Sequence, residues 1–499
     1  MSGKHIPSLC VMASLLLLGG CATRPINPPI TQADPSTGYR FETRQARDKN
    51  KDNLVILAFS GGGTRAAAFS YGVLEFLRRT EVVGPQGNKV RLLDAVDVIT
   101  GVSGGSFTAL AYGLYGDKLF SDYETRFLKR NVQGDLMMRL FMPGNWPALT
   151  SDTYGRSEMA AQLYDEILFD NATFGDLMAR PGPTATVTAT DISTGSRLTF
   201  TQGDFDLICS DVAKVPLSRA AAASSAVPLV LSPVTINNYG GTCGYRKPRW
   251  ARAMEDPNNP SRPAGRALQR LKELDSFQDG TNRPYLHLVD GGLADNLGVR
   301  GVLEALEQVE ASEAVRNGPI IQSLKRIVVF VVNSLSVPQN DWDRRERPPS
   351  DLAILLRATG VPIDRYSYEA VELLKDIIAR WKTFRQLRAA GTFAGGGNPV
   401  LSQVGSVPDI DIHPIVVSFS ALADPDERRF LNDLPTSFVL PPEAVDRLRA
   451  AAGRAIRESP DFKRLLIEMQ AAAVPPPPPM PMPMSRSTPL PAATSAAPQ

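Results

Sequence analysis

The sequence is short of histidine, cysteine and net charge, and each shortage excludes a class of site. It has 54 Lys and Arg residues against 52 Asp and Glu residues, so the formal net charge is +2 and nothing attracts nucleic acid electrostatically. Aromatic residues make up only 7% of the chain, which gives no reason to expect a base-stacking surface. The three histidines and four cysteines show no metal-ligand spacing. We therefore expect no nucleic-acid partner, no metal and no cofactor.

Residues 1–20 have the pattern of an export signal, with a positive charge at Lys4 and an apolar run too short to span a membrane. The string Leu18-Gly19-Gly20-Cys21 resembles the bacterial lipobox, which implies cleavage before Cys21 and lipidation of that residue. Ala22 follows it, which in a Gram-negative host resembles outer-membrane sorting. We expect a membrane-anchored lipoprotein of the bacterial cell envelope. The alternative is a signal peptide with a chance cysteine near its cleavage site.

Both ends of the mature chain differ in composition from its centre. Residues 21–50 contain several prolines with polar neighbours, which predicts an extended tether that does not pack. Residues 471–499 are rich in Pro, Ala and Met, with too few large apolar side chains for a core, so we expect disorder there. The tail could alternatively be a proline-rich ligand. The folded domain is predicted over residues 51–470.

A candidate nucleophile stands at the centre of that domain. Residues 95–100 read as a buried strand and residues 107–114 as an apolar helix, with Gly-Val-Ser-Gly-Gly between them and Ser103 at the corner. A serine on so sharp a turn has a strained backbone, and its neighbours must lack side chains. That requirement is met by Gly101, Gly104 and Gly105. The alternative is an ordinary glycine-rich turn between strand and helix.

A second glycine-rich corner precedes this one. An apolar strand over residues 54–59 is followed by Ser-Gly-Gly-Gly-Thr-Arg and a helix over residues 66–79. A dinucleotide site is disfavoured, because the third glycine of its motif is replaced by Ala66 and no acidic residue is placed to hold a ribose. A P-loop is excluded, because this sequence lacks the lysine of that motif. The remaining interpretation is an oxyanion hole built from the N–H groups of Gly62 and Gly63. Arg65 would add positive charge or brace the loop, or else form a surface ion pair.

A nucleophilic serine needs a base, and histidine is scarce. His287 and His413 both lie inside apparent strands, where a structural role is the commoner one. Asp290 directly follows the strand of residues 285–289, and we expect that strand to be parallel, so that its end meets the same sheet edge as Ser103. A turn or capping role is the alternative for Asp290, and Asp191 is a fallback base with a turn role favoured.

Other segments give coarser predictions. Cys209 and Cys243 are the cysteines left in the mature fold besides Cys21, and in an exported protein we predict that they form a disulfide; two buried free thiols are the alternative. Residues 255–280 read as an exposed insertion. A helix over residues 368–387 has one apolar face, which packs on the core or forms a lid; we favour the core. Residues 442–469 read as a closing helix.

The three motifs, taken in order, resemble those of the patatin-like phospholipases. They are Gly61-Gly62-Gly63-Thr64-Arg65, Gly101-Val102-Ser103-Gly104-Gly105 and Asp290-Gly291-Gly292, and the resemblance covers residues 54–310. It implies a three-layer α/β/α fold with a mostly parallel central sheet. It also implies a Ser–Asp dyad without histidine, with Ser103 as nucleophile, Asp290 as general base and the oxyanion hole around Gly62 and Gly63 beside Arg65. Ala66 departs from the glycine usual in that family.

The activity implied by this resemblance is hydrolysis of a lipid acyl ester, of the phospholipase or lipase type, through an acyl-serine intermediate. A lipid or phospholipid would be the substrate, and the membrane would be reached through lipidated Cys21. Three alternatives stay open. They are an acyltransferase on the same dyad, a non-catalytic envelope-binding lipoprotein, and a histidine-dependent α/β-hydrolase.

Overall fold

The computed structural model describes residues 22–45, 52–83, 87–256, 265–337, 342–390 and 407–469. The predicted signal peptide, the lipidation site Cys21 and the predicted tail over 471–499 lie outside these residues. No helix in the described ranges is both long enough and apolar enough to cross a bilayer.

A mixed sheet forms the centre of the molecule, with its strands in the order β10-β9-β1-β4-β5-β8-β7 and with β6 paired to β5. Five strands run parallel: β1 (Asn53–Phe59), β4 (Val96–Gly101), β5 (Thr184–Asp191), β9 (Arg326–Asn333) and β10 (Asp411–Ser418). Three are antiparallel to their neighbours: β6 (Arg197–Thr199), β7 (Val234–Asn237) and β8 (Tyr285–Val289). A separate hairpin joins β2 (Glu81–Val83) and β3 (Lys89–Arg91).

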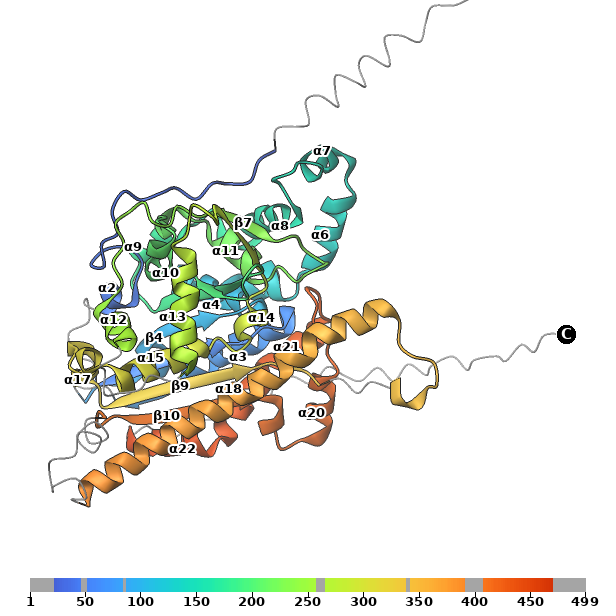
Figure 1. The fold of residues 1–499 in the computed structure, drawn as a ribbon. Coiled ribbons are helices and arrows are strands. Elements are labelled where there is room, and N and C mark those ends of the chain that lie inside the picture. Colours follow the sequence, from blue (N-terminus) through green and yellow to red (C-terminus); the bar gives the residue numbers. More distant parts are fainter. Residues whose placement is uncertain are drawn as a thin grey trace, which may run out of the picture.

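Helices cover both faces of this sheet (Figure 1), so the expected three-layer α/β/α fold with a mostly parallel sheet is confirmed. Alternate residues of β1 point to opposite layers, as a strand buried on both faces requires. Leu57 and Phe59 join a core with α3 (Gly63–Arg79), α4 (Gly104–Tyr115), α11 (Leu217–Ser224) and α21 (Pro442–Glu458). Ile56 joins the other core, with α15 (Arg300–Ala311) and α18 (Asp351–Ala389).

The remaining α-helices in the described ranges have between 4 and 13 residues. They are α2 (Phe41–Gln45), α5 (Leu119–Tyr123), α6 (Val132–Phe141), α7 (Trp146–Leu149), α8 (Arg156–Tyr164), α9 (Phe174–Ala179), α10 (Gln202–Leu207), α12 (Arg249–Glu255), α13 (Gly265–Phe277), α14 (Gly292–Asp295), α16 (Glu313–Arg316), α17 (Pro319–Ser323), α20 (Pro425–Asn432) and α22 (Pro460–Glu468).

The strand before Asp290 has the opposite direction to the one we expected. β5 continues beyond the end of β4 to Asp191, and β8 pairs antiparallel with this extension, placing Val289 opposite Thr190. The chain therefore runs back along the extension and brings Asp290 to the end of β4 from the opposite side. The premise of a parallel strand was wrong, although the residue reaches the predicted sheet edge.

The expected tether is also wrong for its described part, because residues 22–45 pack on the domain and run along its surface (Figure 1, blue). The backbone N–H groups of Ile30 and Ala33 donate to the carbonyls of Cys209 and Cys243, at 2.8 and 3.0 Å. Cys209 and Cys243 form a disulfide beneath this segment. Tyr39 is fully buried. Proline-rich composition predicted an extended backbone, but gave no sign of these distant partners.

Three further elements differ from expectation. The helix predicted over 368–387 is the second half of the longer α18, and the buried side chains of Leu374, Ile377 and Trp381 place that half on the core. The closing helix is two helices, α21 and α22, separated at Ser459, where Pro460 begins the second. The predicted exposed insertion contains α13, whose Phe277 is buried.

Candidate active site

Ser103 lies at a strained corner between β4 and α4. Its backbone has φ 47° and ψ −119°, a conformation that L-residues rarely adopt. The glycines around it are required by close backbone contacts. A Cβ on Gly104 would lie 2.0 Å from the carbonyl oxygen of Gly63, one on Gly105 would lie 2.6 Å from that of Ser60, and one on Gly101 would lie 2.7 Å from the Cα of Ser106. The two predicted corners thus pack against each other without side chains between them.

The side chain of Asp290 meets that of Ser103. The Ser103 hydroxyl donates to Asp290 Oδ2 at 2.8 Å, and the N–H of Gly292 donates to Asp290 Oδ1 at 2.7 Å. The Asp290 N–H donates to the carbonyl of Ala226 at 3.0 Å, which fixes the backbone beneath the carboxylate. A Cβ on Gly291 would lie 2.2 Å from the carbonyl oxygen of Thr188, so this turn also needs glycine. The carboxylate is therefore oriented toward the serine by its own Asp-Gly-Gly turn.

The carboxylate is buried and has no cationic partner within the described part of the chain. Burial raises the pKa of Asp290 from 3.8 to about 6, and the hydrogen bonds from Gly292 and Ser103 oppose that rise. A carboxyl group with a pKa near 6 is a stronger base than an exposed aspartate and is still ionised at neutral pH. It can accept a proton from the hydroxyl group that it contacts.

Backbone N–H groups from both corners adjoin the serine. In the described ranges, the N–H groups of Gly62, Gly63 and Gly104 donate no backbone hydrogen bond, since they stand at or just before the first turns of α3 and α4. The φ angles of Gly62 and Gly63 are 136° and 60°, which favour glycine. Helix N-termini carry partial positive charge, so this arrangement suits a developing oxyanion.

Arg65 braces the loop and pairs with carbonyl groups. It is 2% exposed and donates to the carbonyl oxygens of Ser334 and Leu434, at 2.8 and 2.6 Å, and to the hydroxyl of Thr436 at 3.1 Å. Burial lowers the pKa of its guanidinium to about 10. The alternative of a surface ion pair is wrong, because the side chain is buried and its bonds go to neutral oxygens.

A cavity of about 460 Å³ opens over the dyad. Ser103 and Asp290 line it together with apolar side chains at Val227, Pro228 and Leu293. The first half of α18 and residues 433–436 close other sides of it, and sequence reasoning did not find either. The carbonyl of Asn296, which also lines the cavity, accepts the N–H of Gly61 at 2.9 Å and so positions the first corner.

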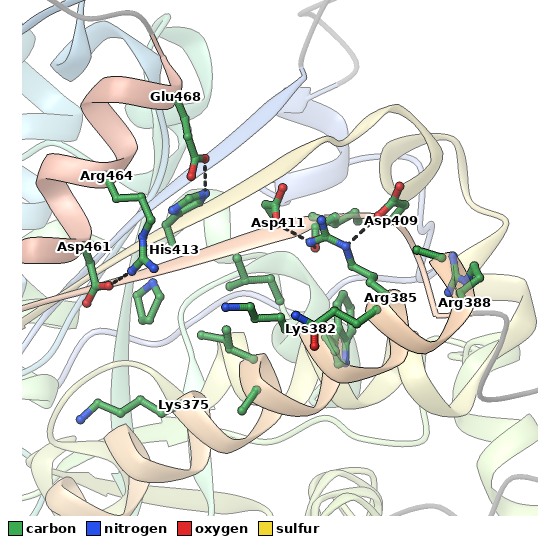
Figure 2. Close-up of a pocket in the computed structure, with 18 residues that line it drawn as sticks. Lys375, Lys382, Arg385, Arg388, Asp409, Asp411, His413, Asp461, Arg464 and Glu468 are labelled. Carbon is green, nitrogen blue, oxygen red and sulfur yellow. Dashed lines mark hydrogen bonds and ion pairs between the residues drawn. The ribbon is translucent and has the colours of Figure 1, made fainter. Parts of the chain in front are cut away.

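The other candidate bases lie elsewhere. His287 is exposed, and its Nδ1 contacts the hydroxyl of Thr235 at 2.9 Å. His413 lies in a different cavity, where its Nε2 is 3.1 Å from a carboxylate oxygen of Glu468 (Figure 2). Asp191 is held in its turn by an ion pair with Arg283. No group of three or more potential metal ligands occurs among the residues that the structure describes.

Comparison with known proteins agrees with the fold. Residues 57–303 match the family model described as patatin-like phospholipase. A search of curated proteins gives no match. Solved structures that resemble the chain include human GIVD cytosolic phospholipase A2, at 13% identity and a TM-score of 0.40 over 86% of this chain and 64% of that one. The same protein in complex with methyl gamma-linolenyl fluorophosphonate gives 13% identity and a TM-score of 0.38, over 86% and 61%. The chain thus spans less than two thirds of the length of these structures.

Proposed function

Since residues 57–303 form a domain of the patatin-like phospholipase family, we propose that the protein hydrolyses acyl esters of lipids through a Ser103–Asp290 dyad. The observation that carries this proposal is the 2.8 Å hydrogen bond from the Ser103 hydroxyl to a buried carboxylate, at a strained corner that holds no histidine.

In the first step, Ser103 Oγ attacks the ester carbonyl carbon while its proton passes to Asp290 Oδ2. The carbonyl oxygen becomes an alkoxide, which the N–H groups around Gly62, Gly63 and Gly104 stabilise; each such donor contributes on the order of 10²–10³ in rate. As the tetrahedral intermediate collapses, the C–O bond to the leaving alcohol breaks, and Asp290 returns the proton to that oxygen. An acyl-serine remains.

In the second step, Asp290 accepts a proton from a water molecule as the water oxygen attacks the acyl carbon. Collapse of this intermediate releases the carboxylic acid, and the proton returns to Ser103 Oγ. The dyad is thereby restored, and the balance needs only water. The apolar side chains of Val227, Pro228 and Leu293 form a wall that suits the acyl chain of a lipid.

We further propose that the mature chain is a lipoprotein of the bacterial envelope, anchored in the outer membrane through Cys21. Support comes from the lipobox-like string and from the packing of residues 22–45, which leaves little chain between the anchor and the domain. Several acyl chains on one residue would hold the protein stably, because each buried CH₂ contributes about 0.8 kcal/mol.

The test measures the carboxylic acid that the purified full chain releases from phosphatidylethanolamine vesicles and from a short-chain ester. The parent chain is compared with Ser103→Ala. Ser336→Ala is the matched control, because Ser336 lines the same cavity without meeting Asp290. We expect hydrolysis by the parent and the control and none above background by Ser103→Ala. A folded parent that releases no acid from either ester would contradict the proposed activity.

A further inference from the structure

One segment of the surface is apolar without an apparent partner. The side chains of Met137, Met138, Phe141, Met142 and Trp146, on α6, α7 and the turn between them, are each between 46% and 66% exposed. We call these five residues the apolar patch. Contiguous exposed apolar side chains on a soluble domain mark an interaction site.

The polar groups of this segment are used internally, so hydrocarbon and thioether are what it presents. Arg139 is the one charged residue in positions 136–149, and it forms an ion pair with Glu166. The indole N–H of Trp146 donates to the carbonyl of Leu140 at 3.3 Å, and the side-chain amide of Asn145 donates to the carbonyl of Arg139 at 2.8 Å. Such a surface has little to offer a polar or charged partner.

The start of the described chain lies beside this patch. Arg24 donates to the carbonyl of Thr235 at 3.2 Å, and Thr235 lines one cavity of about 500 Å³ together with Leu140 and Leu149 of the same α6–α7 segment. Figure 1 shows the blue end of the chain next to α7. In the sequence, Cys21 is only three residues before Arg24.

The segment that carries the patch also contacts a loop that lines the cavity above Ser103. Gln133, in the first turn of α6, donates its N–H to the carbonyl of Phe438 at 3.3 Å, and residues 433–436 of that same loop form a wall of the cavity. On the other side, Val227 and Pro228 line the catalytic cavity, while Ser232 and Pro233 contact the cavity of the α6–α7 segment. Between them, Leu229 and Val230 are 55% and 60% exposed.

We propose that the apolar patch inserts into the surface of a phospholipid bilayer and, with the anchor at Cys21, holds the catalytic cavity next to the membrane. Anchor and patch together give two attachment points, which fix an orientation that a single flexible anchor would not. A segment that exposes Trp, Phe and Met side chains suits the headgroup–acyl boundary, where such side chains bury their apolar surface. The link to catalysis rests on the proposed lipid hydrolysis; binding to the bilayer does not.

The first test measures the position of Trp146. The full chain, with Ser103→Ala so that the lipid stays intact, is mixed with phosphatidylethanolamine–phosphatidylglycerol vesicles containing brominated acyl chains, which quench nearby indoles. We expect quenching that Trp146→Phe abolishes. Fluorescence that the brominated vesicles leave unchanged, or quenching that survives in Trp146→Phe, would overturn the proposal.

The second test removes the lipid anchor, so that the patch acts alone. All compared chains carry Cys21→Ser and Ser103→Ala, so that they have the same N-terminus and cleave no lipid. The patch variant carries Met138→Asp and Phe141→Asp in addition. The control is Ile467→Asp, on α22, whose side chain is 78% exposed. We expect vesicle partitioning to fall on the order of tenfold or more for the patch variant and to change by less than about twofold for the control. Equal partitioning of the two variants would overturn the proposal.

Two further measurements distinguish bilayer insertion of the patch from self-association and from the proposed ester hydrolysis. Sedimentation of the same chains checks for self-association. If the two Asp substitutions dissociate a dimer and leave vesicle binding unchanged, the patch binds a second copy of the chain, and its proposed insertion into a bilayer is wrong. Hydrolysis of a soluble short-chain ester, measured with Ser103 intact, reports on the dyad alone. Quenching of Trp146 without ester hydrolysis would keep the bilayer contact and reject the proposed activity.

Discussion

Two cavities of this molecule differ in size and in chemistry. The one above Ser103 has about 460 Å³ and is lined by glycines, by apolar side chains, by Arg65, Arg357, Asp364 and Asp433, and by the buried carboxylate of Asp290, which has no cationic partner among the described residues. The one around His413 has about 910 Å³ and several charged side chains (Figure 2). Most of its charges are already paired: Arg385 contacts Asp409 and Asp411, and Arg464 contacts Asp461.

If the smaller cavity holds the active site, as we propose, then neither the volume of a cavity nor the presence of a histidine identifies it. In the larger cavity, the carboxylate of Glu468 lies 3.1 Å from His413, but none of the described residues that line this cavity is a serine, threonine or cysteine that the pair could activate. In the smaller cavity, an unpaired carboxylate meets a strained serine. The reactivity that we propose rests on this carboxylate, whose charge is left uncompensated.

The largest expected difference between the two cavities comes from substituting the candidate base in each of them. Asp290→Asn removes the proton acceptor, and we expect ester hydrolysis to fall on the order of 10⁴-fold. His413→Gln, made as the matched change in the other cavity, should keep activity within about twofold. Steady-state kcat/KM on a short-chain ester checks both. Loss of activity in His413→Gln with retention in Asp290→Asn would reverse the assignment.

A smaller effect tests the glycine N–H groups. Gly62→Ala places a Cβ 3.0 Å from a guanidinium nitrogen of Arg65, at a φ of 136°, and shifts the loop beside the serine. We expect a fall in kcat on the order of 10²–10³. Gly87→Ala is the control, because that glycine also has positive φ but nothing within 4 Å of an added Cβ. Equal kcat in the two variants would show that the Gly62 loop does not contribute to the reaction.

The pH dependence should follow the buried carboxyl group. Since the pKa of Asp290 is raised to about 6, the base is ionised above that pH and protonated below it. We expect kcat/KM to be constant above about pH 7 and to fall about tenfold per pH unit well below pH 6. An activity that is still full at pH 4 would show that the carboxylate of Asp290 is not the base.

Stability should change in the opposite direction to activity. The raised pKa means that the ionised carboxylate is less favourable in the folded than in the unfolded chain, a cost present above about pH 6 and lost below about pH 4. Asp290→Asn should therefore raise the free energy of unfolding at pH 8 by about 3 kcal/mol at most, with no gain at pH 4. Asp191→Asn, which breaks the ion pair with Arg283, should lower it. Urea unfolding at the two pH values checks these signs, and a destabilised Asp290→Asn at pH 8 would contradict them.

The sequence was sufficient for features that depend on neighbours along the chain. The two glycine-rich corners and the serine between β4 and α4 follow from local hydrophobic patterns and from residues that only a tight turn requires. The direction of β8 does not, because strand pairing is decided by partners about a hundred residues away. For the same reason, composition predicted a loose tether where the backbone of residues 22–45 pairs with Cys209 and Cys243.

Parts of the site were missed where they come from still more distant segments. Arg65 was predicted beside the oxyanion hole, but its partner at the carbonyl of Leu434 was not, nor was the closure of one side of the cavity above Ser103 by α18. An arginine after a run of glycines can have several roles, and the apolar face of a helix does not indicate which part of the protein it covers. The apolar face of the second half of α18 was visible and its place on the core was favoured, whereas nothing in the sequence indicated that the first half closes the cavity above Ser103.

The most direct test of the central claim is the rate at which a fluorophosphonate labels Ser103, followed by intact mass and peptide mapping. Labelling consumes only the activated hydroxyl and needs no lipid, anchor or acceptor. We predict rapid labelling of Ser103 in the parent and in His413→Gln, with a rate that falls below about pH 6, and labelling slowed on the order of 10³-fold or more in Asp290→Asn. Labelling of Ser103 at an unchanged rate in folded Asp290→Asn would contradict the dyad.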